Sequence, residues 1–275
     1  MGLVIGIDVG GSTTKIVGLD DGQIKSPMFI TATDPITSLF GAFGKYVFDN
    51  GISLSNIEHV MLTGVGSSSV DTPIYGLPTS KADEFLADGL GARFDSGLDR
   101  LMVVSMGTGT TLVKVDNGDI SHVGGISMGG GTLRGLSALL LKTSNIAEVV
   151  DMAARGDISK INLQIKDITT GKLEGLPMHA TASLFGKVAN SKADESDIAK
   201  GIVCMVLETI GSCAVLSALN SGMRDFVLIG NLTRLPDCKV IFPIMEDLYN
   251  VRFHIPAHAE FCTALGAALA YRHQQ

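Results

Sequence analysis

Two segments of the sequence repeat one pattern, and this repeat limits the folds available to the chain more than any other feature. Residues 6–22 read GIDVGGSTTKIVGLDDG, and residues 104–118 read VSMGTGTTLVKVDNG. Each segment contains an apolar strand, a glycine-rich turn with hydroxyl side chains, a second strand, and an acidic turn that ends in glycine. The first copy has Asp8 before its turn, whereas the second copy has Ser105. The repeated hairpin indicates a duplicated architecture.

The rest of the chain alternates between apolar strand patterns and helical patterns. Strands are expected at 3–8, 14–19, 59–64, 101–106, 110–115 and 225–230. Helices are expected at 35–50, 82–92, 133–141, 146–155, 194–221 and in the C-terminal segment CTALGAALAYRH. This order predicts two related α/β lobes with mixed sheets, an N-terminal lobe of residues 1–100 and a C-terminal lobe of residues 101–275, with the last helix crossing back to the first lobe. A ligand is expected in the cleft between the lobes, where the two turns converge.

The composition excludes several other classes of protein. Apolar residues make up 45% of the 275 residues, which is typical of a packed globular protein. We find no apolar run near 18 residues and no signal peptide, and therefore expect no membrane span. The net charge of −7 and the absence of basic runs argue against nucleic acid or an anionic membrane as a partner. Four cysteines without CxxC spacing predict reduced thiols and a cytoplasmic protein.

The glycine turns are candidate phosphate sites, because backbone N–H groups without side chains in the way hold phosphate oxygens. Either turn alone would be read as an ordinary β-turn, but two copies, each after a buried strand, favour a phosphate role. A third segment, LIGNLTRLP at 228–236, is expected to close over a nucleotide base and ribose. Three glycines at 129–131 precede a helix and predict either a backbone contact to phosphate or substrate, or a tight turn with positive φ. The candidate nucleotide-binding residues are Gly10, Gly11, Ser12, Thr13, Lys15, Gly107, Thr108, Gly109, Gly129, Gly130, Gly131, Gly230 and Asn231.

Several of these motifs resemble those of a known superfamily. GIDVGGSTTK, SMGTGTTL and LIGNLT look like the phosphate-1, phosphate-2 and adenosine segments of the acetate and sugar kinase, heat-shock ATPase and actin superfamily. SHVGGISMGGGTLRGLSALL at 121–140 and VVDMAARGDISKINLQIKDI at 149–168 resemble the type II pantothenate kinases more specifically, and the similarity runs from Ile5 to Ala270. The resemblance implies a two-lobed actin-like ATPase fold, of duplicated ribonuclease H-like domains, with ATP in the interlobe cleft.

The resemblance also implies a reaction, the transfer of the ATP γ-phosphoryl group to the 4′-hydroxyl of pantothenate in the first step of coenzyme A synthesis. Asp8 would organise Mg²⁺ through water, beside the β- and γ-phosphates. Lys15 is expected either to add positive charge there or to be a solvated strand residue. Because Ser105 stands where the first copy has its acid, the second hairpin is expected to face the acceptor, with Thr108, Thr110 and Thr111 hydrogen-bonding a polar substrate or the transferring phosphate. A homodimer is expected from the family, with helices around 133–155 or 194–221 as candidate contact surfaces.

The general base is expected on the segment SKADEFLADGLGARF at 80–94. Glu84 and Phe85 are similar to the glutamate–phenylalanine pair of the family, in which the glutamate accepts the hydroxyl proton, so Glu84 is the candidate catalytic residue. Asp83 and Asp88 are expected on the solvated face of the helix, where they complement its dipole.

One position departs from the family pattern and leaves the acceptor open. His122 stands where the family commonly has an arginine that reaches the pantothenate carboxylate, and histidine lacks the bidentate fork and permanent charge of arginine. His122 is therefore a candidate substrate-binding residue, and Arg134 is expected on a helix surface. The alternatives are a kinase for a sugar or pantetheine, and an ATP-hydrolysing activator protein. Such activators typically hold an iron–sulfur cluster with closely placed cysteines, which are not found here.

Overall fold

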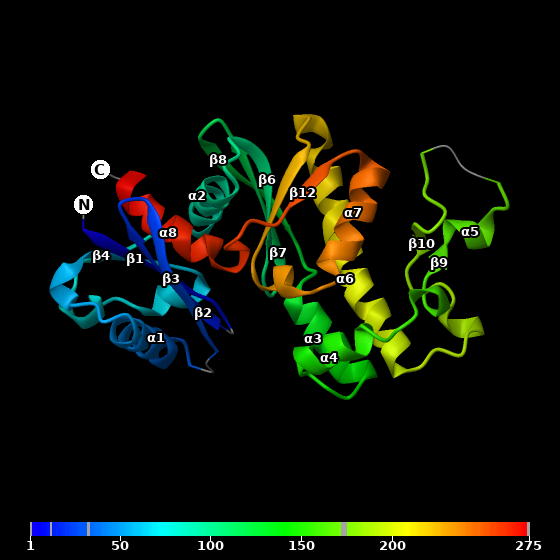
Figure 1. Ribbon diagram of the computed structural model, residues 1–275, viewed down its shortest axis with the longest axis horizontal. Coiled ribbons are helices and arrows are strands. Elements are labelled where there is room, and N and C mark those ends of the chain that lie inside the picture. Colours follow the sequence, from blue (N-terminus) through cyan, green and yellow to red (C-terminus); the bar gives the residue numbers. More distant parts are fainter. Residues whose placement is uncertain (1, 12, 32–33, 172–174, 274–275) are drawn as a thin grey trace.

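The computed structural model describes residues 2–11, 13–31, 34–171 and 175–273 and contains two five-stranded mixed sheets (Figure 1). The strand order is β3-β2-β1-β4-β5 in the first sheet and β12-β11-β6-β7-β8 in the second. The two orders match when the second is read backwards. In each sheet three consecutive strands form an antiparallel meander (β1-β2-β3 and β6-β7-β8), and the first strand of the meander pairs in parallel with a later strand, β4 or β11. The duplication predicted from the repeated hairpin is therefore present in the strand topology.

The first sheet is built from β1 (Leu3–Val9), β2 (Thr13–Asp20), β3 (Gln23–Thr31), β4 (Ile57–Thr63) and β5 (Thr79–Lys81). Alternate apolar residues of β1 face opposite sides. Ile5 and Ile7 pack in one cluster with helix α1 (Pro35–Asp49), and Val4 packs in another with helix α8 (Cys262–His273). Both faces of the sheet are therefore covered by helices.

The second sheet is built from β6 (Arg100–Met106), β7 (Thr110–Asp116), β8 (Asp119–Ile126), β11 (Asp225–Ile229) and β12 (Arg252–His254). On one side lie α3 (Gly130–Leu140), α4 (Ile146–Ala153), α6 (Glu195–Ala218) and α7 (Cys238–Tyr249), whose apolar residues form a core with alternate residues of β6. On the other side lies α2 (Glu84–Ser96), which contacts β6, β7 and β8.

Helices α2 and α8 lie between the two sheets and pack against each other so closely that their backbones are in contact (Figure 1). A Cβ atom at Gly91 would lie 1.9 Å from the carbonyl oxygen of Cys262, and one at Gly266 would lie 1.7 Å from that of Ala87. A Cβ at Gly6 would similarly lie 2.0 Å from the carbonyl oxygen of Ala264, so α8 also approaches β1 closely. Helix α8, which follows the second sheet in the chain, thereby packs on the first sheet.

The division of the chain at residue 100 stays a prediction. β6 begins at Arg100, close to the expected boundary, and α2 ends with Gly97 as its left-handed C-terminal cap. Helix α2 was assigned to the N-terminal lobe, yet it contacts strands of the second sheet as well as α8. A lobe boundary before α2 would fit the packing of this helix as well as a boundary after it.

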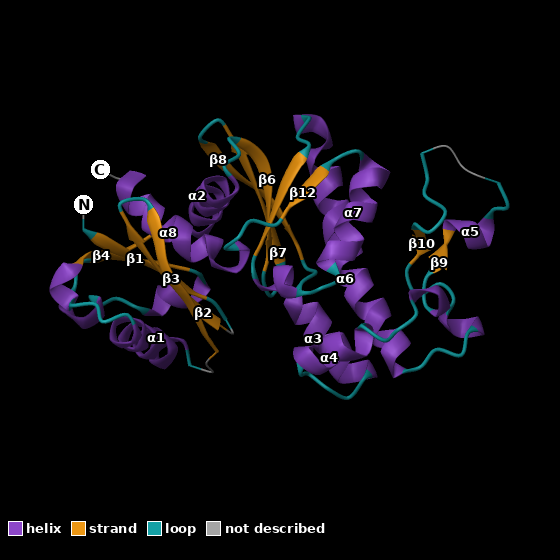
Figure 2. Cartoon of the chain, viewed as in Figure 1, coloured by secondary structure: helices purple, strands orange, loops and turns teal. Residues whose placement is uncertain are grey.

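An arm between α4 and α6 extends away from the two sheets (Figure 2). It contains the short ladder of β9 (Leu163–Gln164) and β10 (Thr181–Ser183) and the single helical turn α5 (Ile165–Ile168). The buried carboxylate of Asp197 on α6 holds the start of the arm, because it accepts hydrogen bonds from the Asp157 N–H (2.7 Å) and the Lys160 ammonium (2.9 Å).

Among the described residues, one helical stretch of 27 residues, Glu195–Ser221, is long and apolar enough to cross a membrane, although the sequence showed no uninterrupted apolar run of that length. In its most apolar window 56% is buried, and the residues of α6 belong to the core behind the second sheet. Its apolar character is accounted for by this packing, as expected for a central helix.

The contact between α2 and α8 can be tested with two glycine substitutions. Gly266→Ala should destabilise the protein by about 3 kcal/mol or more, because the new methyl group meets backbone atoms that cannot move aside independently. Gly41→Ala is the matched control, since this glycine lies in the exposed part of α1 with no atom within 4 Å of a built Cβ. It should stabilise by about 0.5–1 kcal/mol. Urea unfolding measures both, and equal effects would contradict the packing described here.

Candidate active site

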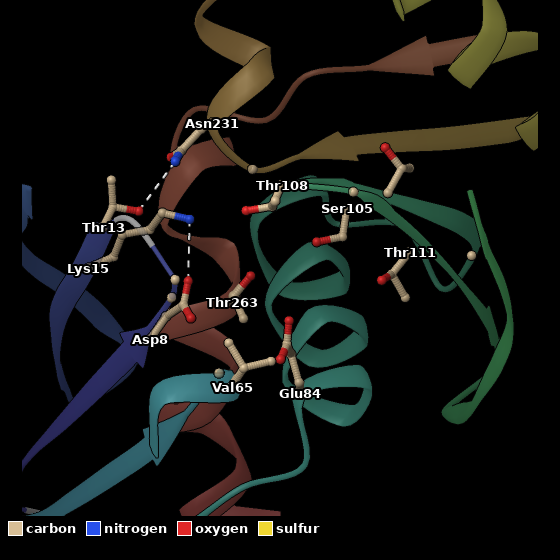
Figure 3. Close-up of a pocket in the computed structure, with 18 of the residues that line it drawn as sticks. Asp8, Thr13, Lys15, Val65, Glu84, Ser105, Thr108, Thr111, Asn231 and Thr263 are labelled. Carbon is tan, nitrogen blue, oxygen red and sulfur yellow. Dashed lines mark hydrogen bonds and ion pairs between the residues drawn. The ribbon is translucent and has the colours of Figure 1, made fainter. Parts of the chain in front are cut away.

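A cleft of about 570 Å³ lies between the two sheets and is lined by both glycine turns (Figure 3). The first hairpin contributes Asp8, Gly10, Gly11, Thr13 and Lys15, and the second contributes Ser105 and residues 107–111. The remaining lining comes from the ends of later elements: Gly64, Val65, Glu84, Gly125, Ile126, Ser127, Gly230, Asn231 and Thr263. The cleft therefore brings together residues from distant parts of the chain, from Asp8 near its start to Thr263 near its end.

Asp8 and Lys15 face each other across the first hairpin, in the paired register of β1 and β2. The Lys15 ammonium donates to Asp8 Oδ2 at 3.3 Å, and the two side chains are only 8% and 10% exposed. Lys15 is therefore not a solvated strand residue, and the alternative that adds positive charge to the cleft fits its position. Gly64 packs beside this pair with φ of +84°, and a Cβ there would lie 2.5 Å from Asp8 Oδ1.

The first turn is closed by a hydrogen bond from the Gly10 N–H to the Thr13 carbonyl at 3.0 Å. Nothing lies within 4 Å of a Cβ built on Gly11, so this part of the turn is open toward the cleft. The Asn231 side-chain amide donates to Thr13 Oγ1 at 3.3 Å (Figure 3), which ties the third glycine segment to the first turn. Ser12 lies outside the described residues.

The second turn is supported from behind by the glycines at 129–131. The Gly130 and Gly131 N–H groups donate to the carbonyl oxygens of Gly107 (2.8 Å) and Thr108 (2.9 Å). A Cβ at Gly129 would lie 2.6 Å from the Thr108 oxygen, while its φ of 175° is extended, so close approach and not positive φ requires the glycine. These two N–H groups serve the turn, and none of the three glycines lines the cleft.

Thr108, Thr110 and Thr111 of this hairpin all line the cleft. The Thr110 hydroxyl donates to the Met128 carbonyl at 2.8 Å, and its residue is buried. Thr110 therefore holds the strand that follows the second turn.

Glu84 begins α2 at the wall of the cleft, directly after the helix cap. The Asp83 carboxylate accepts a hydrogen bond from the Leu86 N–H at 2.9 Å and stays exposed, as expected for an N-cap. Burial raises the pKa of Glu84 above its ordinary value; the negative charge of Asp8 adds to this, and the positive charge of Lys15 opposes it. Glu84 is thus a carboxyl group whose proton affinity is increased within the cleft.

The expectation for Asp88 is wrong, because this carboxyl is buried and does not lie on a solvated face. Its residue is 1% exposed, and the Thr263 hydroxyl donates to Oδ1 at 2.6 Å. Burial raises the pKa of Asp88 to about 7, although hydrogen bonding by Thr263 and Ser105 lowers it. No local sequence pattern indicates this burial, since both partners of Asp88 come from other segments of the chain.

His122 is not among the residues that line the cleft. Its exposed ring stacks on Phe85, with 4.0 Å between ring centroids and 6° between planes. His122 thus contacts the residue that follows the candidate base Glu84, but it lies outside the cleft wall. Arg134 is exposed on α3, as expected.

The overall arrangement matches solved structures that share the actin-like ATPase fold. The activator of 2-hydroxyisocaproyl-CoA dehydratase from Clostridium difficile, solved with ADPNP, aligns with a TM-score of 0.69 at 18% identity, over 99% of this chain and 95% of that one. The ROK hexokinase of Thermus thermophilus aligns with a TM-score of 0.58 at 12% identity, over 99% of this chain and all of that one. These likenesses confirm the predicted class of fold, a two-lobed actin-like ATPase.

The sequence comparisons define the family within this class. The family model of Fumble matches residues 99–269, and the chain belongs to the Fumble family. The type II pantothenate kinase of Staphylococcus epidermidis is 27% identical over 96% of this chain and 98% of its own length. A 4′-phosphopantetheine phosphatase of Mus musculus is 37% identical over 47% of this chain, a match that spans only 16% of the mouse protein. The resemblance to type II pantothenate kinases is confirmed.

The buried ion pair of Asp8 and Lys15 predicts a strong coupling between these residues. Lys15→Met should destabilise the protein by about 3 kcal/mol, because it leaves Asp8 charged and unpaired in a largely buried position. Adding Asp8→Asn should restore most of this loss. The exposed pair Lys45 and Asp49 is the control, with an expected coupling of about 0.5 kcal/mol. Urea unfolding of both double-mutant cycles measures the difference, and similar couplings would refute the assignment.

Proposed function

We propose that this protein transfers the γ-phosphoryl group of ATP to the 4′-hydroxyl of pantothenate, the first step of coenzyme A synthesis. The observation that supports it most directly is the position of Glu84, a carboxyl group of raised pKa in the cleft that both glycine turns line. The choice of pantothenate as the acceptor rests on the similarity to type II pantothenate kinases along nearly the whole chain. The sequence resemblance implies the same base and the same acceptor, and Glu84 lines the cleft together with residues of both glycine turns.

ATP is proposed to bind with its phosphates between the two turns. The open backbone at Gly10 and Gly11 and the turn at 107–109 offer N–H groups to phosphate oxygens, and Lys15 adds positive charge. Gly230 and Asn231 are proposed to contact the nucleoside, because the Asn231 side chain reaches the first turn at Thr13. Gly129, Gly130 and Gly131 contribute by shaping the second turn and not by direct contact.

The donor set fits Mg²⁺ held mainly by water and phosphate, because the described residues offer one cleft carboxylate near the first turn and no group of three metal-ligating side chains. Asp8 is the residue proposed to hold it. On the strand beside Asp8, the buried Thr63 hydroxyl has no hydrogen-bond partner among the described residues and can accept or donate there. When bound, Mg²⁺ neutralises negative charge on the phosphate oxygens.

Glu84 is proposed to accept the proton of the acceptor hydroxyl as the new phosphorus–oxygen bond forms. For this it must be ionised, and because its pKa is raised, activity should increase with pH through a range above that of an ordinary glutamate. Thr108 and Thr111 are proposed to orient the acceptor with their hydroxyls. In this proposal the acceptor lies opposite the turn that carries Asp8.

A second candidate is a kinase for another small alcohol, such as a sugar or pantetheine. It is favoured by His122, which stacks on Phe85 and lies outside the cleft wall, so it offers a pantothenate carboxylate no buried positive charge. An ATP-hydrolysing activator is a third candidate, in view of the fold shared with the dehydratase activators. Three of the four thiols are buried, which disfavours a shared cluster.

The proposed reaction is tested by release of ADP from ATP and Mg²⁺ with pantothenate, in a coupled assay beside a reaction without acceptor. The wild-type protein should require pantothenate. Glu84→Gln should lower kcat by about 10²- to 10⁴-fold, because it removes the proton acceptor while keeping the shape of the side chain. Asp83→Asn is the matched control and should stay within about threefold of wild type, since asparagine caps a helix as well as aspartate.

The other possible outcomes separate the alternatives. Turnover with pantetheine or a sugar but not with pantothenate would show that the acceptor is another small alcohol. Equal turnover without any acceptor would indicate the activator class. Full activity of the Glu84→Gln variant would overturn the assignment of the base while leaving the reaction in place.

The homodimer and the cytoplasmic location are also proposals. Helices α3 and α6 leave leucines largely exposed, at 68% for Leu139, 50% for Leu140 and 58% for Leu216. Such apolar side chains fit the expected contact surfaces between subunits. The four free cysteines agree with a reducing compartment.

A further inference from the structure

The carboxyl group of Asp88 lies directly behind the cleft and has no part in the reaction proposed above. It stands one helical turn after Glu84 on α2, and residues four apart lie on the same face of a helix. Its residue is 1% exposed, so the carboxyl is enclosed by protein on all sides. A fully buried acid without a lysine or arginine partner is uncommon and needs a physical explanation.

Two residues that line the cleft surround this carboxyl. Thr263, at the start of α8, donates its hydroxyl to Asp88 Oδ1 at 2.6 Å. Ser105, at the end of β6, lies near enough to the carboxyl to favour its ionised form. Figure 3 shows both hydroxyls at the wall of the cleft, on the side of Glu84. Asp88 thus lies between helix α8, which packs on the first sheet, and strand β6 of the second sheet.

The second oxygen of the carboxyl shows which form the site is built for. Asp88 Oδ2 is buried and has no hydrogen-bond partner among the described residues. An ionised carboxylate would leave this atom charged and unpaired, which is costly in a buried position. A protonated carboxyl carries its proton on this atom and is uncharged, so leaving the atom unpaired costs less.

The surrounding charges also favour the protonated form. The ionisable groups that face Asp88 are Glu84 on α2, Asp8 on β1 and the buried thiol of Cys262 on α8. Burial raises the pKa of Asp88 to about 7, and the negative charges of Glu84 and Asp8 add to this against the effect of Thr263 and Ser105. Lys15, which is paired with Asp8, acts on Glu84. Because Asp88 is fully enclosed whereas Glu84 lines the open cleft, we expect Glu84 to ionise first and Asp88 to follow at higher pH.

We propose that Asp88 is a positioning residue of the phosphoryl-transfer site, whose protonated carboxyl holds the Thr263 hydroxyl at the cleft wall beside Ser105 and whose ionisation switches the site off. Ionisation adds a negative charge one turn behind Glu84, where the substrate already brings negative phosphates. This inference rests on the proposed kinase function for its effect on rate. The protonation of Asp88 itself is a property of the folded protein and does not depend on that function.

The protonation state is measured first, by NMR titration of the aspartate carboxyl carbons in the ¹³C-labelled protein without substrates. One signal should titrate near pH 7 and should be missing from the Asp88→Asn variant. A cooperative urea unfolding transition confirms that this variant is folded. If every aspartate signal titrates near the ordinary value of 3.8, the inference is overturned, whatever the protein catalyses. Failure of this measurement and failure of the kinase assay are thus separate results.

The effect on rate is measured by the pH profile of kcat/KM. Wild-type activity should rise as Glu84 ionises and then fall about tenfold per pH unit once Asp88 ionises. Asp88→Asn keeps an acceptor for the Thr263 hydroxyl but cannot ionise, so the fall at high pH should disappear while the rate at pH 6 stays within about threefold of wild type. An alkaline limb that persists unchanged in Asp88→Asn would refute the proposal.

Two further variants separate this role from a purely structural one. Thr263→Val removes the hydrogen bond that favours the ionised form, so the alkaline limb should move to higher pH, whereas Thr263→Ser should leave it in place. Asp83→Asn alters an exposed acid of the same helix and should keep the wild-type profile. A loss of rate that is equal at all pH values in Thr263→Val would indicate a structural role only and would contradict the proposal.

Discussion

The close contact between α2 and α8 is the constraint on which the rest of the site depends. At Gly91 and Gly266 the two helices approach so closely that a methyl group on either would overlap a backbone oxygen of the other. This contact fixes the start of α2, where Glu84 stands, relative to the start of α8, where Thr263 stands. Because α8 also packs on β1 through Gly6, the same contact sets the distance between Glu84 and the hairpin that carries Asp8.

The duplicated hairpins explain why one copy has a carboxylate and the other does not. In the first copy Asp8 is balanced by Lys15 across the hairpin. In the second copy the corresponding residue, Ser105, faces the buried carboxyl of Asp88. A second carboxylate at position 105 would be placed against Asp88 without a positive partner, which protein interiors avoid. The asymmetry follows from what lies behind each turn.

The repeated hairpin was enough to predict the two-lobed architecture, the cleft and the strands of both turns, because glycine turns and alternating apolar residues are local signals. The third strands, β3 and β8, were not predicted: β3 is partly exposed along its length, and β8 is mostly exposed and contains Gly124 and Gly125. Helix α7 was also missed, and it contains Pro243. The role of Asp88 depends on contacts with residues 17 and 175 positions away, which no local pattern reports.

The central claim is that the cleft holds the triphosphate between the two turns, with Glu84 beside the acceptor hydroxyl. A crystal structure with Mg²⁺, a non-hydrolysable ATP analogue and pantothenate tests it most directly. We expect the β- and γ-phosphates between the turns at 10–13 and 107–109, and a Glu84 carboxylate oxygen within about 3.2 Å of the 4′-hydroxyl. Phosphates bound away from both turns, or an acceptor hydroxyl nearer to another carboxylate than to Glu84, would contradict the account.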